Sequence, residues 1–411
     1  MFGVSLKDRA AVLAAGHAAD GAYWIDHKSG VWVTSTYYRS ELPKWVADFN
    51  ASQRTSKYWD REWTDTSGAS LGSTAHRKNQ DGSAADFYEV VGATPFANDY
   101  EFEFVRELIL YEHLGTGPAT DLLTVGLSAN DILGHHVGPD SPAMEAMILD
   151  TDRQLADFFS FLGHQVGLAN VWMAFAADHG VAPLPSLATK LHLPAANLSA
   201  QSLQAQINKL LAAKLSPGRT PAFIAKMDYP LAWLNDEVFA ALKIKEGDAE
   251  RLVGEAMKQE GFRGYFTRAQ LAEGAVPDTD LGRRYRNSYS SEGGWWVMGV
   301  PAPFTVGVTE GTNHGSPYSY DTHVPFGLYG LAFQTGTYYT HVEPVDLAVT
   351  LAALLGINAP THAVGRVLKE GLAPAHHGEN PSPPPEKSPR PPKPSTELKP
   401  ASVSLCGGGR P

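Results

Sequence analysis

The sequence has almost no cysteine, no long apolar run and no excess of basic charge, and each absence excludes a class of site or protein. Its single cysteine, Cys406, can form no intramolecular disulfide and is too little for a thiolate zinc site. No run of about 18 apolar residues occurs, so we expect no membrane-spanning helix. Residues 1–9 also lack the apolar segment of a signal peptide.

Acidic residues outnumber basic ones by 44 to 33, which gives the 411-residue chain a formal charge of −11. This balance argues against nucleic acid as a partner, because nucleic-acid phosphates attract a basic surface. It does not argue against a small phosphate ester, since local charge can oppose the net charge of the chain.

The apolar pattern predicts an α/β fold. Residues 122–127 and 171–175 are short apolar runs typical of buried strands, and Ser141-Pro142 marks the start of a long helix between them. A strand, a long helix and a second strand in this order are typical of a parallel βαβ unit. Further strands are expected at 2–6, in a hairpin of 22–26 with 31–35, and at 295–300 and 324–329.

Composition and pattern together divide the chain into four segments. We expect a core built from 1–184 and 291–372, an inserted cap region at 185–290, and a disordered tail at 373–411. The tail is rich in proline, serine, lysine and glutamate, and it buries too little apolar area to offset its ordering entropy. The predicted fold class is α/β, with a largely parallel central sheet flanked by helices and the inserted cap.

Two Asp/His pairs follow the two apolar strands. Asp131 and His135 are four residues apart, which places both on one face of a helical turn, and Asp178-His179 follows residues 171–175. Residues past the carboxyl ends of strands line the ligand crevice of an open α/β sheet, and carboxylate with imidazole suits Zn²⁺. The alternative for each pair is structural, a capping aspartate beside a surface or hydrogen-bonded histidine. Together the pairs favour a dinuclear metal site and metal-assisted hydrolysis.

Two further groups are candidates for the same crevice. His314 lies in a loop that leads to the strand at 324–329, and His323 competes with it. Lys7 and Arg9 follow the first strand and flank Asp8, so that both can face one side and hold phosphoryl oxygens. A lone loop histidine is more often structural or solvated, and two solvated cations are the alternative for Lys7 and Arg9.

These motifs together resemble the alkaline phosphatase superfamily, in the branch of type I phosphodiesterases and nucleotide pyrophosphatases. Within it, the resemblance is closest to alkaline phosphatases with a threonine nucleophile and a Lys/Arg phosphate clamp. It covers residues 1–370 and rests on residues 5–9, 131–139, 177–180, 314–316 and 321–325, which follow the family order.

The resemblance implies a zinc-dependent phosphate monoester hydrolase with two Zn²⁺ in the complete site. The implied ligands are Asp131, His135 and His314 for one Zn²⁺, and Asp178 and His179 for part of the other. His314 is preferred to His323 because related phosphodiesterases carry the ligand in a His-Gly motif. Lys7 and Arg9 would contact the transferred phosphoryl group. The alternatives are a phosphodiesterase of the same superfamily or a non-catalytic metal-binding remnant.

One difference from the family pattern affects the expected activity. Family members begin with a strand that carries another aspartate ligand, followed by the threonine or serine nucleophile, and this sequence begins after both. We therefore expect an N-terminally truncated chain with little or no turnover. The resemblance also implies a small phosphate-ester substrate and a periplasmic or secreted location, and it leaves the oligomeric state open.

Overall fold

The computed structural model of the chain describes residues 1–79, 82–292, 294 and 296–373. From position 374 onward, the tail predicted to be disordered lies outside the described residues. None of the described helices is long and apolar enough to cross a membrane.

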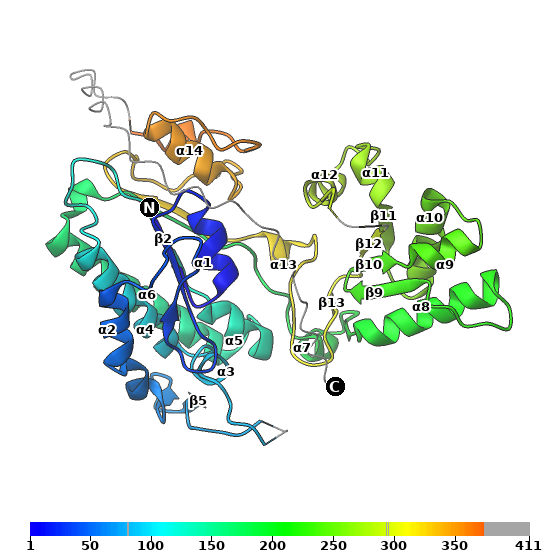
Figure 1. The fold of residues 1–411 in the computed structure, drawn as a ribbon, viewed down its shortest axis with the longest axis horizontal. Helices are drawn as coiled ribbons and strands as arrows, with labels where there is room; N and C mark the ends of the chain where they lie inside the picture. Colours follow the sequence, from blue (N-terminus) through cyan, green and yellow to red (C-terminus); the bar gives the residue numbers. More distant parts are fainter. Residues whose placement is uncertain (80–81, 293, 295, 374–411) are drawn as a thin grey trace. The chain divides into compact units, whose positions relative to one another are not determined.

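A four-stranded sheet in the order β3-β2-β1-β6 contains the first strands of the chain (Figure 1). Its strands are β1 Phe2–Ser5, β2 Gly21–Ile25, β3 Trp32–Val33 and β6 Leu123–Gly126. β1 pairs in parallel with both β2 and β6, in agreement with the predicted α/β class. β2 and β3 are antiparallel, which confirms the predicted hairpin.

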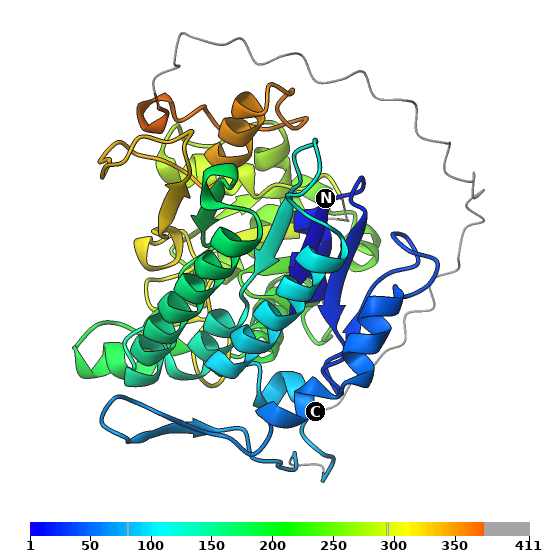
Figure 2. The same ribbon diagram turned by 90° about the vertical axis from the view of Figure 1, so that its left-hand side faces the viewer.

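The two faces of this sheet pack differently because side chains alternate along each strand. Phe2 and Val4 join the large apolar core, to which α4 (Pro95–Tyr111) and α6 (Pro142–Gln165) contribute. α4 and α6 lie side by side in Figure 2 and contact each other. On the other face, a Cβ atom at Gly3 would lie 2.5 Å from the carbonyl oxygen of Ala11 in α1 (Asp8–Ala15). The glycine therefore lets α1 approach the sheet closely.

The predicted start of the long helix is confirmed. The Ser141 hydroxyl accepts a hydrogen bond from the Met144 backbone N–H at 3.1 Å, and Pro142 is the first residue of α6. Such a cap satisfies one of the backbone donors that a helix leaves free at its first turn. The shorter helix α5 (Ala129–Val137) connects β6 to this start and also contacts α6.

The strand after α6 has an unexpected partner. β7 (Met173–Ala176) pairs antiparallel with β14 (Phe326–Tyr329), with Ala176 opposite Phe326. No hydrogen-bonded ladder joins β7 to β6 in the described part of the chain, so these two strands do not pair directly. An apolar run predicts that a strand forms, whereas the choice of a partner far along the chain depends on tertiary contacts.

A second four-stranded sheet is antiparallel, in the order β11-β12-β10-β9. Its strands are β9 Ile224–Asp228, β10 Leu231–Leu234, β11 Gly264–Thr267 and β12 Trp296–Val300. Together with α8 (Ala200–Leu215) and α10 (Glu246–Gln259), it surrounds an apolar core of its own. The predicted cap boundary at residue 290 falls before β12, which belongs to this sheet. The division into four segments stays a prediction.

The remaining elements are short. They are α2 Lys44–Ala51, η1 Arg54–Tyr58, β4 Glu62–Thr64, β5 Ser70–Ser73, α3 Phe87–Val90, η2 Leu168–Asn170, α7 Pro185–Lys190, β8 Ala196–Asn197, α9 Asp236–Ala241, α11 Arg268–Ala272, α12 Asp280–Asn287, β13 Thr305–Val306, α13 Ser319–Thr322, α14 Asp346–Leu354 and η3 Lys369–Gly371.

Candidate metal centre

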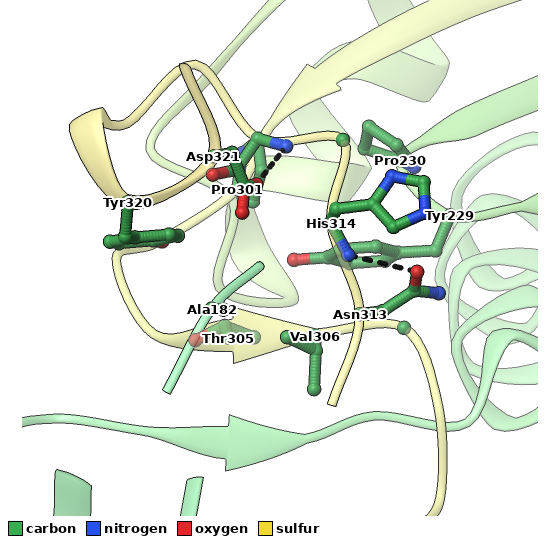
Figure 3. Close-up of a pocket in the computed structure, with 13 residues that line it drawn as sticks. Ala182, Tyr229, Pro230, Pro301, Thr305, Val306, Asn313, His314, Tyr320 and Asp321 are labelled. Atoms are coloured by element: carbon green, nitrogen blue, oxygen red, sulfur yellow. Dashed lines mark hydrogen bonds between the residues drawn. The ribbon is translucent and has the colours of Figure 1, made fainter. Parts of the chain in front are cut away.

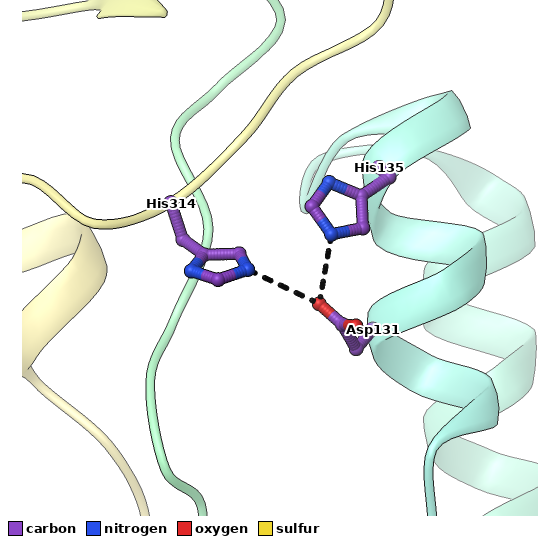
Figure 4. A group of neighbouring side chains, drawn as sticks. All are labelled: Asp131, His135 and His314. Atoms are coloured by element: carbon purple, nitrogen blue, oxygen red, sulfur yellow. Dashed lines mark ion pairs between the residues drawn. The ribbon is translucent and has the colours of Figure 1, made fainter. Parts of the chain in front are cut away.

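Three imidazoles gather around one carboxylate oxygen, Oδ1 of Asp131. His135 lies one helical turn further along α5, and its Nε2 atom is 3.2 Å from that oxygen. The Nε2 atoms of His314 and His179 lie 3.8 Å and 3.9 Å from it. Figure 4 shows His135 and His314 directed toward Asp131 from two separate segments. The donor atoms of Asp131, His135 and His314 all lie within 4.8 Å of one another, close enough to share one cation.

Backbone carbonyls orient two of the imidazoles. Nδ1 of His135 lies 3.0 Å from the carbonyl oxygen of Thr312, and Nδ1 of His179 lies 2.8 Å from that of Gly180. A carbonyl only accepts hydrogen bonds, so Nδ1 carries a proton in each ring, and Nε2 is the nitrogen that a metal would bind. Histidines that bind metals are held in this way, with the second ring nitrogen donating to a backbone or carboxylate oxygen.

The loop that carries His314 is anchored to α5. The Thr312 backbone N–H donates to the carbonyl oxygen of His135 at 2.9 Å. Gly311 has φ +68°, and a Cβ atom there would overlap with the same carbonyl oxygen. The ring of His314 stacks on His179, with centroids 3.4 Å apart. The structure thus places His314 in the cluster, whereas His323 is an exposed residue after α13.

The protonation states of Asp131 and His314 suit metal ligation, whereas the hydrogen bond to Asp131 raises the pKa of His135, so that a metal must displace a proton from its Nε2 atom. Burial opposes ionisation of Asp131, but hydrogen bonds from His135 and Lys7 outweigh it and hold the Asp131 pKa below its usual range. Burial, assisted by His179, lowers the pKa of His314 to about 4. His314 is therefore a neutral imidazole near pH 7, which is the form that binds metals.

The other predicted site residues lie around this cluster. Lys7 forms an ion pair with Oδ2 of Asp131. Arg9 lies on the first turn of α1, and its guanidinium makes no hydrogen bond or ion pair among the described residues. Asp178 has an 87% exposed side chain, and its Oδ2 atom is 3.6 Å from Nε2 of His179. The carboxylate of Asp178 is thus open to solvent.

Two residues at the site were not predicted as functional. Asp321 is buried, accepts a hydrogen bond from the Ser316 backbone N–H at 2.7 Å, and accepts another from Gly180 on its own carbonyl oxygen. It therefore ties the loop of His314 to the loop of His179, and it lines a pocket beside His314 (Figure 3). Burial raises its pKa. Because Asp321 is the first residue of the motif at 321–325, the sequence could have indicated it.

The second residue that was not predicted as functional is Tyr88 in α3. Its hydroxyl lies within electrostatic range of Asp131 and Arg9, and burial raises its pKa to about 12, so that it keeps its proton. No spacing in the sequence marks Tyr88, because it reaches the site only through the packing of α3.

The donor set fits Zn²⁺. Imidazole nitrogen and carboxylate oxygen are both common zinc ligands, and three or four of them complete most protein zinc sites. The Nε2 atoms of the histidines and the ionised Asp131 supply such a set without a thiolate.

An α/β fold with a cluster of imidazoles and carboxylates just past strand ends is typical of metal-dependent hydrolases. Comparison with known proteins gives the family. The profile of the type I phosphodiesterase / nucleotide pyrophosphatase family matches residues 8–251. The chain belongs to this family, within the alkaline phosphatase superfamily, as the sequence motifs had indicated, and it is a phosphatase-type hydrolase.

Several relatives match nearly the whole described chain. Alkaline phosphatase PafA of Elizabethkingia meningoseptica is 30% identical over 392 residues, which are 90% of this chain and 71% of the relative. Alkaline phosphatase PhoV of Synechococcus elongatus is 28% identical, with coverages of 90% and 70%. A protein of Myroides odoratus named calcium-transporting ATPase is also 28% identical, with coverages of 90% and 72%.

A solved structure supports the fold. The crystal structure of wild-type alkaline phosphatase PafA superimposes with a TM-score of 0.78 at 28% identity, and the match covers 90% of this chain and 74% of that one. The predicted α/β fold class is thereby confirmed.

Proposed function

We propose that this protein is a zinc-dependent phosphate monoester hydrolase. The observation that carries the proposal is the convergence of three imidazole Nε2 atoms on one oxygen of Asp131. Two relatives named alkaline phosphatase, which match 90% of the chain, support it. By the same resemblance, we propose a periplasmic or secreted location.

The proposed ligands form two groups. Asp131, His135 and His314 hold one Zn²⁺, and Asp178 with His179 supplies part of the shell of a second. When bound, Zn²⁺ supplies Lewis acidity that polarises a phosphoryl oxygen and stabilises the attacking and leaving oxygens. The protein contributes orientation, because the carbonyls of Thr312 and Gly180 fix the rings of His135 and His179 before a metal binds.

Lys7 and Arg9 are proposed to bind the phosphoryl oxygens. Lys7 is held beside the cluster by Asp131, and the guanidinium of Arg9, two residues further on, has no partner in the described part of the chain. A solved PafA variant carries replacements of a lysine and an arginine two positions apart, the same spacing as Lys7 and Arg9. A guanidinium binds two phosphoryl oxygens at once, and an ammonium provides a point charge for the third. Two cations on the non-bridging oxygens favour a dianionic monoester over a diester.

Zinc titration of the chain by calorimetry tests the metal centre. The wild-type chain should bind Zn²⁺, and His314→Ala should lower the affinity by at least about 100-fold, because a direct ligand contributes at least as much as an outer-shell partner. His323→Ala is the matched control, since this exposed histidine lies nine positions along the same segment. Equal zinc affinity for the His314 variant and the control would refute the assignment.

A phosphodiesterase of the same superfamily is the second candidate, and the family profile favours it. Hydrolysis of p-nitrophenyl phosphate and of bis-p-nitrophenyl phosphate by the zinc-loaded protein separates the two, and a preference for the diester would contradict our proposal. The expectation of little turnover stays a prediction, which robust hydrolysis of either ester would contradict. A chain that binds zinc but no phosphate would be a metal-binding remnant, the third candidate.

A further inference from the structure

Tyr88 lies at the same edge of the sheet as Lys7 and Asp131. It lies against the turn that follows β2, where its backbone N–H donates to the carbonyl oxygen of His27 at 2.9 Å. Because β2 is parallel to β1, the chain leaving β2 at His27 and the chain leaving β1 at Lys7 emerge at one edge. This edge is the one from which β6 leads into α5 and Asp131.

The ring of Tyr88 is held in place from several sides. It stacks on the ring of His27, with centroids 4.2 Å apart and an interplanar angle of 10°. The helix that carries it begins with a capping box, in which Asp86 accepts from the Glu89 backbone N–H at 2.9 Å. The position of the ring is thus set by the protein, so that little ordering is needed when a ligand binds.

The hydroxyl of Tyr88 is free to bind a ligand. It forms no hydrogen bond within the described residues, and neither does the guanidinium of Arg9. The hydroxyl of Tyr88 lies within electrostatic range of Asp131, Arg9 and Asp8. A phosphoryl group offers three non-bridging oxygens, and hydrogen bonds from neutral hydroxyls to charged oxygens are stronger than those between neutral groups.

We propose that Tyr88 is a further phosphate-binding residue, whose hydroxyl donates a hydrogen bond to an oxygen of the phosphoryl group that Lys7 and Arg9 bind. This assignment rests on the proposed function, because it requires phosphate at the zinc centre. The hydroxyl adds a directional donor without a further positive charge, which helps to position the group rather than only attract it.

The test compares Tyr88→Phe with the wild type by calorimetric titration of inorganic phosphate into the zinc-loaded chain. Phenylalanine keeps the stack on His27 and removes only the donor. Phosphate affinity should fall about tenfold, the effect of losing one hydrogen bond to a charged oxygen, while zinc affinity stays unchanged. Tyr339→Phe is the matched control, because Tyr339 is 95% exposed and its replacement should leave both affinities unchanged.

The outcomes separate the two proposals. No phosphate binding by the zinc-loaded wild type would overturn the proposed function and, with it, the role of Tyr88. Phosphate binding that is equal in wild type and Tyr88→Phe would overturn only the role of Tyr88. A loss of zinc affinity in the variant would make the hydroxyl structural and equally overturn it. If Tyr88→Phe does not fold, tyrosine nitration of the zinc-loaded wild type, measured by mass spectrometry, replaces the variant. Phosphate should protect Tyr88 from nitration, and equal nitration with and without phosphate would contradict the proposal.

Discussion

Replacement of Gly311 by alanine should damage the proposed metal centre without changing a proposed ligand. Gly311 has φ +68°, a conformation that costs an L-residue roughly 1–2 kcal/mol. Its added Cβ atom would also overlap with the carbonyl oxygen of His135. That carbonyl accepts the hydrogen bond from Thr312, which holds the loop of His314 against α5. Relief of the overlap must therefore move either His135 or the loop that brings His314.

Gly274→Ala is the control for the backbone conformation alone. Gly274 also has φ +68°, but nothing lies within 4 Å of the Cβ atom that would be added there. We expect it to lower the free energy of unfolding by about 1–2 kcal/mol, with no effect on zinc binding. Gly311→Ala should cost a further 1–3 kcal/mol, typical of an overpacked site, and it should lower zinc affinity by about 10-fold or more, as misplaced ligands do.

Urea unfolding of the apo chains measures the stability difference, and calorimetry measures the zinc affinity. If Gly311→Ala bound zinc as tightly as Gly274→Ala does, the loop contact would not position His314, and the account of the site would be wrong.

Three further predictions concern stability. Glu101 is fully buried without a hydrogen-bond partner among the described residues, and burial raises its pKa well above the usual value. The folded protein therefore loses stability as the pH rises above the ordinary glutamate pKa. Glu101→Gln should remove this loss, so the variant should gain more free energy of unfolding over the wild type at pH 8 than at pH 4, as measured by urea unfolding. An equal gain at both pH values would contradict this prediction. Gly3→Ala should destabilise by about 1–3 kcal/mol, because α1 packs too closely for a methyl group, and an unchanged urea midpoint would contradict this contact. Zinc at a thousandfold excess over its dissociation constant should stabilise the fold by about 4 kcal/mol, and a melting temperature that EDTA leaves unchanged in zinc-containing buffer would argue against a bound metal.

Local elements were predictable because their causes are local. The spacing of Asp131 and His135 places them on one face of α5 whatever the rest of the chain does. Nε2 of His135 lies 3.2 Å from Oδ1 of Asp131. The start of α6 at Ser141 likewise depends on a hydroxyl and a proline within one turn. The hairpin of β2 and β3 needed only a short turn between two apolar runs.

Partners distant in sequence were harder to predict. The choice between His314 and His323 was open on chemistry alone. Only His314 lies beside Asp131, in a loop that Gly311 and Thr312 hold on α5. Tyr88 carried no signal, because only the packing of α3 against the turn after β2 brings it within electrostatic range of Asp131 and Arg9.

By itself, the sequence determined the α/β class, the turn that pairs Asp131 with His135, and the residue types that could bind a metal. The antiparallel pairing of β7 with β14 and the convergence of His179 and His314 on Asp131 were decided by tertiary structure. The physical reason is the range of the interactions: caps, turns and helical spacing act within a few residues, whereas strand partners and metal ligands are selected among segments that only the folded core brings together.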